Sequence, residues 1–315
     1  MTGELKIFAG SSNPKLTQLI CQHLNIPFGK SHSFKFSDGN IYVKIDESVR
    51  QDHVFIVQSG SVPVNDNVIE LLFYIEAFKR ASAASVTAVI PFFPYTKGDK
   101  KDEPRVSIRA KVIAETLESV GVDRVLVMDL LPPQIQGFFN KPVDNLYAQS
   151  VFIDYIAAKK IENPVIVSTD IGGAKMARKF ARKFNAPVAI GDKEREGHSE
   201  KAITENIIGD VAGKTAIIVD DMIISGGSLL ALIQALKESG APRIYACISH
   251  GLLTGSVIEK IQQSPLDELI ITDTIALPDD KINQKIIQLS VAHIFAEAIK
   301  SVYTGTSMSL LFDED

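Results

Sequence analysis

The chain has 315 residues, which suits two domains better than one, because a single hydrophobic core stops growing at about 250–300 residues. Hydrophobic residues make up 45% and charged residues 23%, which is too apolar for a disordered protein. The formal net charge of -5 argues against general electrostatic binding to nucleic acid, although it is compatible with a local basic pocket for phosphate. We therefore expect a small anionic ligand and no nucleic-acid partner.

The chain shows no sign of disulfides, export or membrane insertion. Its only cysteines, Cys21 and Cys247, are far apart in apolar runs, so neither a disulfide framework nor a thiolate metal site is indicated. The N-terminus lacks a signal-peptide pattern, and no segment is apolar for long enough to cross a bilayer. We expect two buried core cysteines, no membrane partner and a cytoplasmic protein.

Strand and helix patterns alternate along the chain. Apolar runs rich in Val and Ile predict buried strands at residues 5–10, 53–60, 86–92, 124–130, 164–170, 215–221, 243–251 and 268–274. Helical spacing predicts helices at residues 68–81, 107–120 and 228–239. The alternation runs twice, with residues 140–150 as the crossing, and no repeat of solenoid length is present. This order predicts an α/β protein with parallel sheets and helices on both faces.

The strongest candidate site follows the predicted strand at residues 215–221. It combines two adjacent carboxylates with two glycines flanked by serines: Asp220, Asp221, Ser225, Gly226, Gly227 and Ser228. Glycines allow a ligand to approach the backbone closely, and free N–H groups at a helix start bind phosphate. The residues alone fit an ordinary strand-to-helix turn equally well. Neither a Walker loop nor a Gly-x-Gly-x-x-Gly fingerprint is present.

This run is similar to the ribose-phosphate loop of the phosphoribosyltransferase fold. Further runs resemble, in order, those of the ribose-phosphate pyrophosphokinases (PRPP synthetases), among them KIFAGSSN, FSDGN, NDNVIELL, DKKDEPR, QIQGFF, STDIGGAK, DKER and GTSMSLLF. The resemblance covers nearly the whole chain and implies two phosphoribosyltransferase-type domains, each a mostly parallel sheet flanked by helices. We expect residues 1–147 to form the ATP side and residues 148–315 the ribose 5-phosphate side, with the last segment packing back on the first domain.

The resemblance implies transfer of the β,γ-diphosphoryl group of Mg-ATP to the C1 hydroxyl of ribose 5-phosphate, with Mg²⁺ as cofactor and PRPP and AMP as products. It implies charge stabilisation by Lys193 and Arg195 on a mobile loop, and a metal-side carboxylate at Asp170. The implied diphosphate loop contains Asp170, Gly172, Gly173 and Lys175. The implied ATP-binding residues are Phe36, Asp38, Asn40, Lys97 and Asp99, the first three reaching a neighbouring subunit's adenine pocket. Without the resemblance, Asp170 would be interpreted as a helix cap and the DKER run as an exposed loop.

Regulation and assembly are also implied by the resemblance. The residues that match an effector site for phosphate or ADP, formed across subunits, are Ser48, Arg50, Ser82, Arg105, Ser307 and Ser309. Arginines with hydroxyl groups form a suitable anion site. We therefore expect a homo-oligomer, a hexamer built from dimers.

Several positions depart from the family pattern where nucleotide is handled. Leu131 replaces a histidine that lies close to metal-bound ATP, and leucine can neither bind a metal nor donate a hydrogen bond. Lys97 and Gly98 replace Arg-Gln, and Ile224 stands where a polar residue is common. These changes leave a second interpretation open, a weak or inactive paralogue with a regulatory role. A phosphoribosyltransferase that consumes PRPP is less favoured, because the ATP-side segments would then have no purpose.

Overall fold

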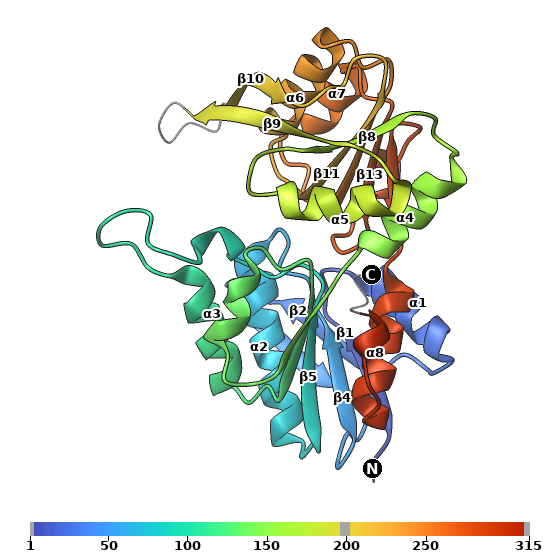
Figure 1. The fold of residues 1–315 in the computed structure, drawn as a ribbon. Helices are drawn as coiled ribbons and strands as arrows, with labels where there is room; N and C mark the ends of the chain where they lie inside the picture. Colours follow the sequence, from blue (N-terminus) through green and yellow to red (C-terminus); the bar gives the residue numbers. More distant parts are fainter. Residues whose placement is uncertain (1–2, 196–201, 312–315) are drawn as a thin grey trace.

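The structure is a computed structural model that describes residues 3–195 and 202–311 (Figure 1). The elements of the first half are β1 (Leu5–Ala9), α1 (Pro14–Leu24), β2 (Ser31–Lys35), β3 (Ile41–Ile45), β4 (His53–Val57), α2 (Val64–Arg80), β5 (Ser85–Ile90), η1 (Thr96–Gly98), α3 (Arg109–Ser119), β6 (Arg124–Met128), η2 (Pro133–Phe138) and β7 (Val143–Leu146). Those of the second half are α4 (Gln149–Ala158), β8 (Pro164–Ser168), α5 (Ala174–Phe184), β9 (Val188–Arg195), β10 (Ala202–Ile208), β11 (Thr215–Ile223), α6 (Gly227–Glu238), β12 (Ile244–Gly251), α7 (Val257–Gln263), β13 (Glu268–Thr272), η3 (Asp279–Lys281), β14 (Ile286–Leu289), α8 (Ala292–Thr304) and η4 (Ser309–Leu311).

The first sheet has five parallel strands in the order β1-β4-β5-β6-β7. Successive side chains of a strand point to opposite faces, so both faces of a buried strand need a cover. In β4, Val54 and Ile56 pack in the core with α2 and α3, whereas Phe55 and Val57 pack in the core with α1 and α8. Helices therefore cover both faces of this sheet, as the alternating pattern predicted. A separate antiparallel hairpin joins β2 and β3.

The second sheet has seven strands in the order β10-β9-β8-β11-β12-β13-β14, and all neighbours are parallel except β10 and β9. In β11, Ala216 and Ile218 belong to the core cluster of α6 and α7, and Ile217 and Val219 to that of α4 and α5. The fold is thus α/β with two helix-covered parallel sheets, as the sequence predicted.

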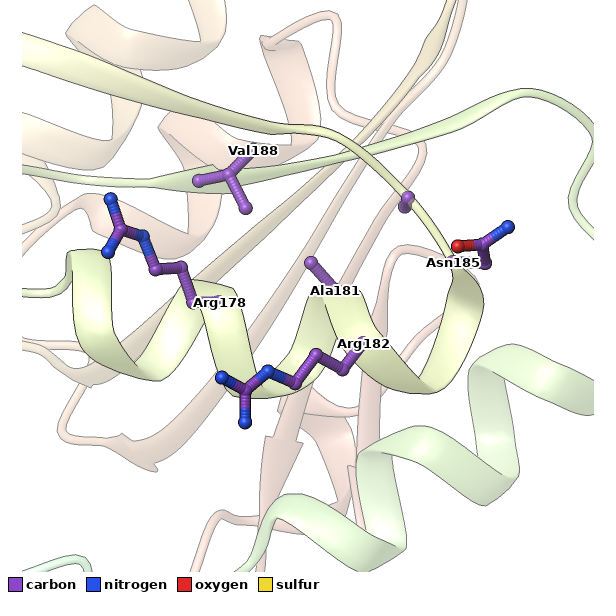
Figure 2. A pocket seen from close by; sticks show the side chains of 6 residues that line it. Arg178, Ala181, Arg182, Asn185 and Val188 are labelled. Carbon is purple, nitrogen blue, oxygen red and sulfur yellow. The ribbon is translucent and has the colours of Figure 1, made fainter. Parts of the chain in front are cut away.

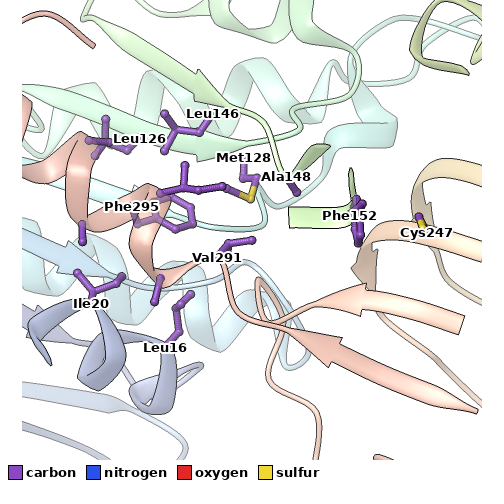
Figure 3. Packing of buried hydrophobic residues seen from close by; sticks show 14 of the residues in the cluster. Leu16, Ile20, Leu126, Met128, Leu146, Ala148, Phe152, Cys247, Val291 and Phe295 are labelled. Atoms are coloured by element: carbon purple, nitrogen blue, oxygen red, sulfur yellow. The ribbon is translucent and has the colours of Figure 1, made fainter. Parts of the chain in front are cut away.

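One apolar cluster runs through both halves. Figure 3 shows Leu16 of α1, Met128 of β6 and Phe295 of α8 packed near Phe152 of α4, and all four are buried. Although α8 follows the second sheet in the chain, it packs against α1 of the first half. The last helix therefore ties the end of the chain to the first sheet.

The carboxyl ends of the two sheets face each other. His250, at the end of β12, lies 3.1 Å through its Nε2 atom from the Met128 carbonyl oxygen at the end of β6. The Ser59 hydroxyl, just after β4, donates a 2.6 Å hydrogen bond to the carbonyl oxygen of Thr274, just after β13. Turns that follow the strands therefore meet between the halves, which is where ligands bind in parallel α/β folds.

The sequence predicted the Val- and Ile-rich strands and missed the short or polar strands. All eight predicted strands and all three predicted helices are present. The strands that were not predicted are β2, β3, β7, β9, β10 and β14. Both cysteines are buried thiols, and in the described part of the chain no helix is both long and apolar enough to span a membrane.

Candidate functional site

Two of the predicted loops lie side by side because their strands are neighbours. Strands β8 and β11 run parallel, with Ser168 opposite Val219, so the residues that follow each strand emerge at the same edge. The Thr169 hydroxyl donates a 2.8 Å hydrogen bond to Asp220 Oδ2, which joins the two loops directly. The structure thus brings the predicted diphosphate loop against the predicted ribose-phosphate loop.

Hydrogen bonds within the predicted diphosphate loop hold its conformation. Asp170 Oδ1 accepts a 3.0 Å hydrogen bond from the Gly173 N–H, and the Ser168 hydroxyl donates a 2.6 Å bond to the Asp170 carbonyl oxygen. A Cβ atom on Gly173 would lie 2.6 Å from Ser168 Oγ, so a side chain there would displace the Ser168 hydroxyl from its bond to Asp170. Helix α5 follows, with Lys175 exposed in its first turn. Asp170 therefore shapes the loop before the helix, and its Oδ1 does not cap α5 itself.

The two adjacent carboxylates have different environments. Asp221 is only 6% exposed, and its Oδ2 atom has no hydrogen-bond partner among the described residues. Burial, and next the charge of Asp220, raise the pKa of Asp221 well above its usual range. Asp220 is more exposed and accepts the Asp221 N–H at 3.0 Å. Asp220 is thus the more accessible carboxylate, while the unpartnered Oδ2 atom of Asp221 is buried.

The turn into α6 leaves backbone N–H groups unsatisfied. Gly226 is the N-cap, with a φ of +75°, and no side chain caps the helix. A Cβ atom on Gly226 would lie 2.3 Å from Val257 Cγ2, so both the backbone conformation and the available space require glycine. Ser225, Gly227 and Ser228 are all partly exposed around this helix start. Free amides at the positive end of a helix suit a phosphate dianion.

The predicted ATP-binding residues lie on two elements of the first half. Phe36, 48% exposed at the end of the β2–β3 hairpin, packs edge-on against Phe34 with a centroid separation of 4.8 Å. Asp38 accepts hydrogen bonds from both the N–H and the side-chain amide of Asn40, so these two residues stabilise the hairpin turn. Lys97 belongs to η1, after β5, and Asp99 follows it.

The predicted catalytic pair lies in a strand rather than on a loop. The backbone of Lys193 and Arg195 belongs to β9, where they pair with Thr204 and Ala202 of β10. The run DKER was expected on a loop because it is polar, and antiparallel pairing with β10 overrides that composition. The side chains of both residues, and all of residues 196–201, lie outside the described residues.

Among the described residues, no histidine near Leu131 is free to replace the one that the family pattern predicts at this position. Leu131 is 42% exposed after the carboxyl end of β6. His250 lies at the same junction, but its Nδ1 and Nε2 atoms are already bonded to the Thr274 hydroxyl and the Met128 carbonyl oxygen. Burial lowers the pKa of His250 to about 4, so it is neutral near pH 7. His250 is therefore a structural residue between the halves.

Sequence reasoning missed two carboxylates that accept several hydrogen bonds, the partly buried Asp129 and the buried Glu70. Asp129 accepts hydrogen bonds from the Ser249 hydroxyl and from the Ala148 N–H, and burial raises its pKa to about 6. Glu70 of α2 is 3% exposed and accepts hydrogen bonds from Ser11, from Ser33 on the hairpin and from Gln58. A carboxylate within an otherwise apolar run was the only available signal in either case.

The predicted effector residues form separate groups in one chain. The Ser82 carbonyl oxygen accepts the Gln51 N–H at 2.8 Å, which places Ser82 beside the segment that contains Ser48 and Arg50. Ser307 and Ser309 share a 2.8 Å hydrogen bond near the end of the chain. Arg105 lies on the segment before α3.

A further shallow pocket, of about 270 Å³, lies between α5 and β9 (Figure 2). Its lining residues are Arg178, Ala181, Arg182, Asn185, Ala186 and Val188. None of them is a predicted site residue, and the pocket is distinct from the two adjacent loops.

The fold and the paired loops define an α/β protein of phosphoribosyltransferase type that has two such sheets. The family model described as the N-terminal domain of ribose phosphate pyrophosphokinase matches residues 5–121, and that of the phosphoribosyl synthetase-associated domain matches residues 196–313. The chain therefore belongs to the ribose-phosphate pyrophosphokinase family, as the sequence predicted.

Individual relatives agree over nearly the full length. The ribose-phosphate pyrophosphokinase of Caldanaerobacter subterraneus is 49% identical over 99% of this chain and 98% of its own length. That of Bacillus caldolyticus is 46% identical over 98% of both chains. The crystal structure of phosphoribosylpyrophosphate synthetase from Mycobacterium smegmatis superposes with a TM-score of 0.89 at 34% identity, covering 96% of this chain and 99% of that one.

Proposed function

We propose that this chain is a ribose-phosphate diphosphokinase, which transfers the β,γ-diphosphoryl group of ATP to the C1 hydroxyl of ribose 5-phosphate. The observation that carries the proposal is the hydrogen bond from Thr169 to Asp220, which joins a diphosphate loop to a ribose-phosphate loop. Relatives at 46–49% identity over nearly the full chain carry the name of this activity. Both loops lie at the strand ends that face the first half.

Ribose 5-phosphate would bind to the loop after β11. The amides at the start of α6, with Ser225 and Ser228, would hold the 5-phosphate, because no side chain occupies that helix start. Asp220 and Asp221 would accept hydrogen bonds from the vicinal ribose hydroxyls. C1 of the sugar would then face Asp170, because the two loops are joined by the hydrogen bond between Thr169 and Asp220.

Magnesium fits the residues of this site as a weakly held ion. Among the described residues no group of three or more His, Cys, Asp or Glu side chains is arranged to hold a metal. Mg²⁺ usually keeps several waters and takes only one or two carboxylates plus substrate phosphates, and Asp170 would supply such a carboxylate. When bound, the ion would neutralise charge on the phosphates.

The protein's part in the reaction would be positioning and charge stabilisation. Gly172, Gly173 and Lys175 would surround the transferred diphosphoryl group with amides and one cation. Lys193 and Arg195 would stabilise charge that develops in the transition state. Phe36, Asp38 and Asn40 of a neighbouring subunit, with Lys97 and Asp99, would hold the nucleotide. The attacking C1 oxygen forms its bond to the β-phosphorus as AMP leaves.

A second candidate function follows from the exposed Leu131 side chain, which offers no ligand at the nucleotide side of the site. We propose, as the alternative, a weak or inactive paralogue that assembles with an active synthetase and regulates it. The catalytic proposal is preferred because Mg²⁺ needs few protein ligands, so one lost contact weakens turnover without abolishing it.

The proposal extends to domains, assembly and effectors. We place the domain boundary between residues 147 and 148, where β7 leads into α4. The exposed aromatic hairpin would complete an adenine pocket in a neighbouring subunit, which would make dimerisation a condition of activity. The homo-oligomer would be a hexamer built from dimers, as the family resemblance implies. Phosphate would activate and ADP inhibit at a site assembled across subunits. The compartment would be the cytoplasm.

The test is AMP formation by purified chain with Mg-ATP and ribose 5-phosphate, alone and mixed with an active synthetase from a relative. Activity of the chain alone supports the diphosphokinase. Modulation of the partner by a folded, oligomeric chain that has no activity of its own supports the regulator. Diphosphate release that depends on a nucleobase would instead indicate a phosphoribosyltransferase.

A further inference from the structure

The Arg109 side chain fills the space beside Gly98. Gly98 ends η1 and is buried, whereas Arg109 begins α3. A Cβ atom on Gly98 would lie 2.5 Å from Arg109 Nε, 2.8 Å from its Cβ and 3.2 Å from its Cζ. The guanidinium therefore lies directly against the backbone of Gly98, and any side chain at position 98 would displace it.

The same contact places the Arg109 charge beside Lys97. Arg109 Nη2 lies 3.5 Å from the Lys97 carbonyl oxygen, which is a long and weak hydrogen bond. Within the described part of the chain no carboxylate forms an ion pair with Arg109, although the next cation on the same helix, Lys111, pairs with Glu115 at 2.8 Å. A guanidinium has five N–H donors, so most of those of Arg109 remain available to a ligand.

We propose that Arg109 binds the phosphates of ATP and supplies the planar two-point donor that Lys97 cannot. A lysine offers a single point charge, whereas a guanidinium binds two phosphate oxygens at once. Gly98 contributes to the proposed phosphate site, because the absence of a side chain there leaves the space in which Arg109 lies. The inference rests on the proposed function, since it needs the nucleotide at Lys97 and Asp99.

The first test compares Arg109→Ala with Lys111→Ala, which removes the same charge two residues further along α3. We expect Arg109→Ala to raise the KM for ATP about 10- to 150-fold, the range for loss of a charge-assisted hydrogen bond. The KM for ribose 5-phosphate should change less than about twofold, and Lys111→Ala should change neither. Arg109→Lys should lie between wild type and alanine, because it keeps the charge and loses the fork.

Gly98→Ala tests the contact itself. The added methyl displaces Arg109, so this variant should also raise the KM for ATP. The double variant Gly98→Ala, Arg109→Ala should be no worse than Arg109→Ala alone, because the two changes remove one interaction. If the increases in the KM for ATP caused by Gly98→Ala and Arg109→Ala instead multiply in the double variant, the proposed role of Gly98 is contradicted.

The outcomes separate this inference from the proposed function. AMP formation by wild type supports the diphosphokinase whatever Arg109 does. An Arg109→Ala enzyme whose KM for ATP equals that of Lys111→Ala, or whose two KM values rise equally, overturns the role of Arg109. If wild type turns over too slowly, ATP binding by calorimetry with the folded oligomer replaces KM in the same comparison. A wild type that binds no ATP at all would overturn both proposals.

Discussion

Replacing Gly226 by alanine tests the geometry of the turn that would hold the sugar phosphate. Two costs add at this position. An L-residue in the left-handed conformation costs roughly 1–2 kcal/mol, and Gly226 has a φ of +75°. The new Cβ would also lie 2.3 Å from Val257 Cγ2, and overpacking of this kind costs roughly 1–3 kcal/mol. We expect a loss of about 2–5 kcal/mol in the free energy of unfolding.

Gly213→Ala is the matched control. Gly213 has a φ of +67°, but a Cβ atom there would meet nothing within 4 Å, so only the conformational cost applies. Urea unfolding of both variants, with binding of ribose 5-phosphate measured in parallel, separates the two costs. Gly226→Ala should lose more stability than Gly213→Ala and bind the sugar phosphate at least tenfold more weakly, about 1.4 kcal/mol. Equal losses of stability with unchanged binding would refute the account of this turn.

Three further predictions concern the first half and its junction with the second. Leu131→His should raise turnover severalfold by restoring a ligand near the nucleotide. Unchanged turnover would show that Leu131 does not limit the reaction. Phe36→Ala should raise the KM for ATP about tenfold, since stacking of a base on an aromatic ring contributes about 1–3 kcal/mol; a change confined to the ribose 5-phosphate KM would count against the hairpin. The pKa of Asp129 is raised to about 6, so the folded state binds its proton more tightly and the contribution of Asp129 to stability falls as pH rises from about 4 to 6. The pKa of His250 is lowered to about 4, so its contribution to stability rises as pH rises from about 4 to 6.5. Asp129→Asn leaves the His250 contribution unopposed, so between about pH 6.5 and 4.5 the variant should lose about 2 kcal/mol more stability than wild type. Parallel pH profiles in urea unfolding would contradict this.

The parts of the fold that sequence predicted are those fixed by local pattern. Short runs rich in the β-branched residues Val and Ile and bounded by turn residues favour buried strands, so β11 and β12 were predicted. The hairpin strand β2, with the sequence SHSFK, is short, polar and half exposed, and its pairing with β3 depends on α2 lying beneath it. Strand β9 starts beside β8, but its charged end resembles a loop in sequence, and that end pairs with the antiparallel strand β10.

The candidate site likewise has features that the sequence predicted and features that it did not. Asp170 lies just after β8, and Asp220 lies near the carboxyl end of the neighbouring parallel strand β11. The alternation of strands and helices already indicated that these strands are parallel. The contact between Gly98 and Arg109, and the carboxylate of Glu70 that links the hairpin to the first sheet, join positions whose approach depends on tertiary packing. No local sequence pattern predicts these contacts, so they are identified only in the folded structure.

The most direct test of the proposed activity follows the γ-phosphate of ATP. With γ-labelled Mg-ATP and ribose 5-phosphate, the label should appear in the sugar product at the same rate as AMP forms, because the β- and γ-phosphates move together. Label released as inorganic phosphate with ADP as the other product, or no labelled sugar from a folded oligomer at saturating substrate, would contradict diphosphoryl transfer by this chain.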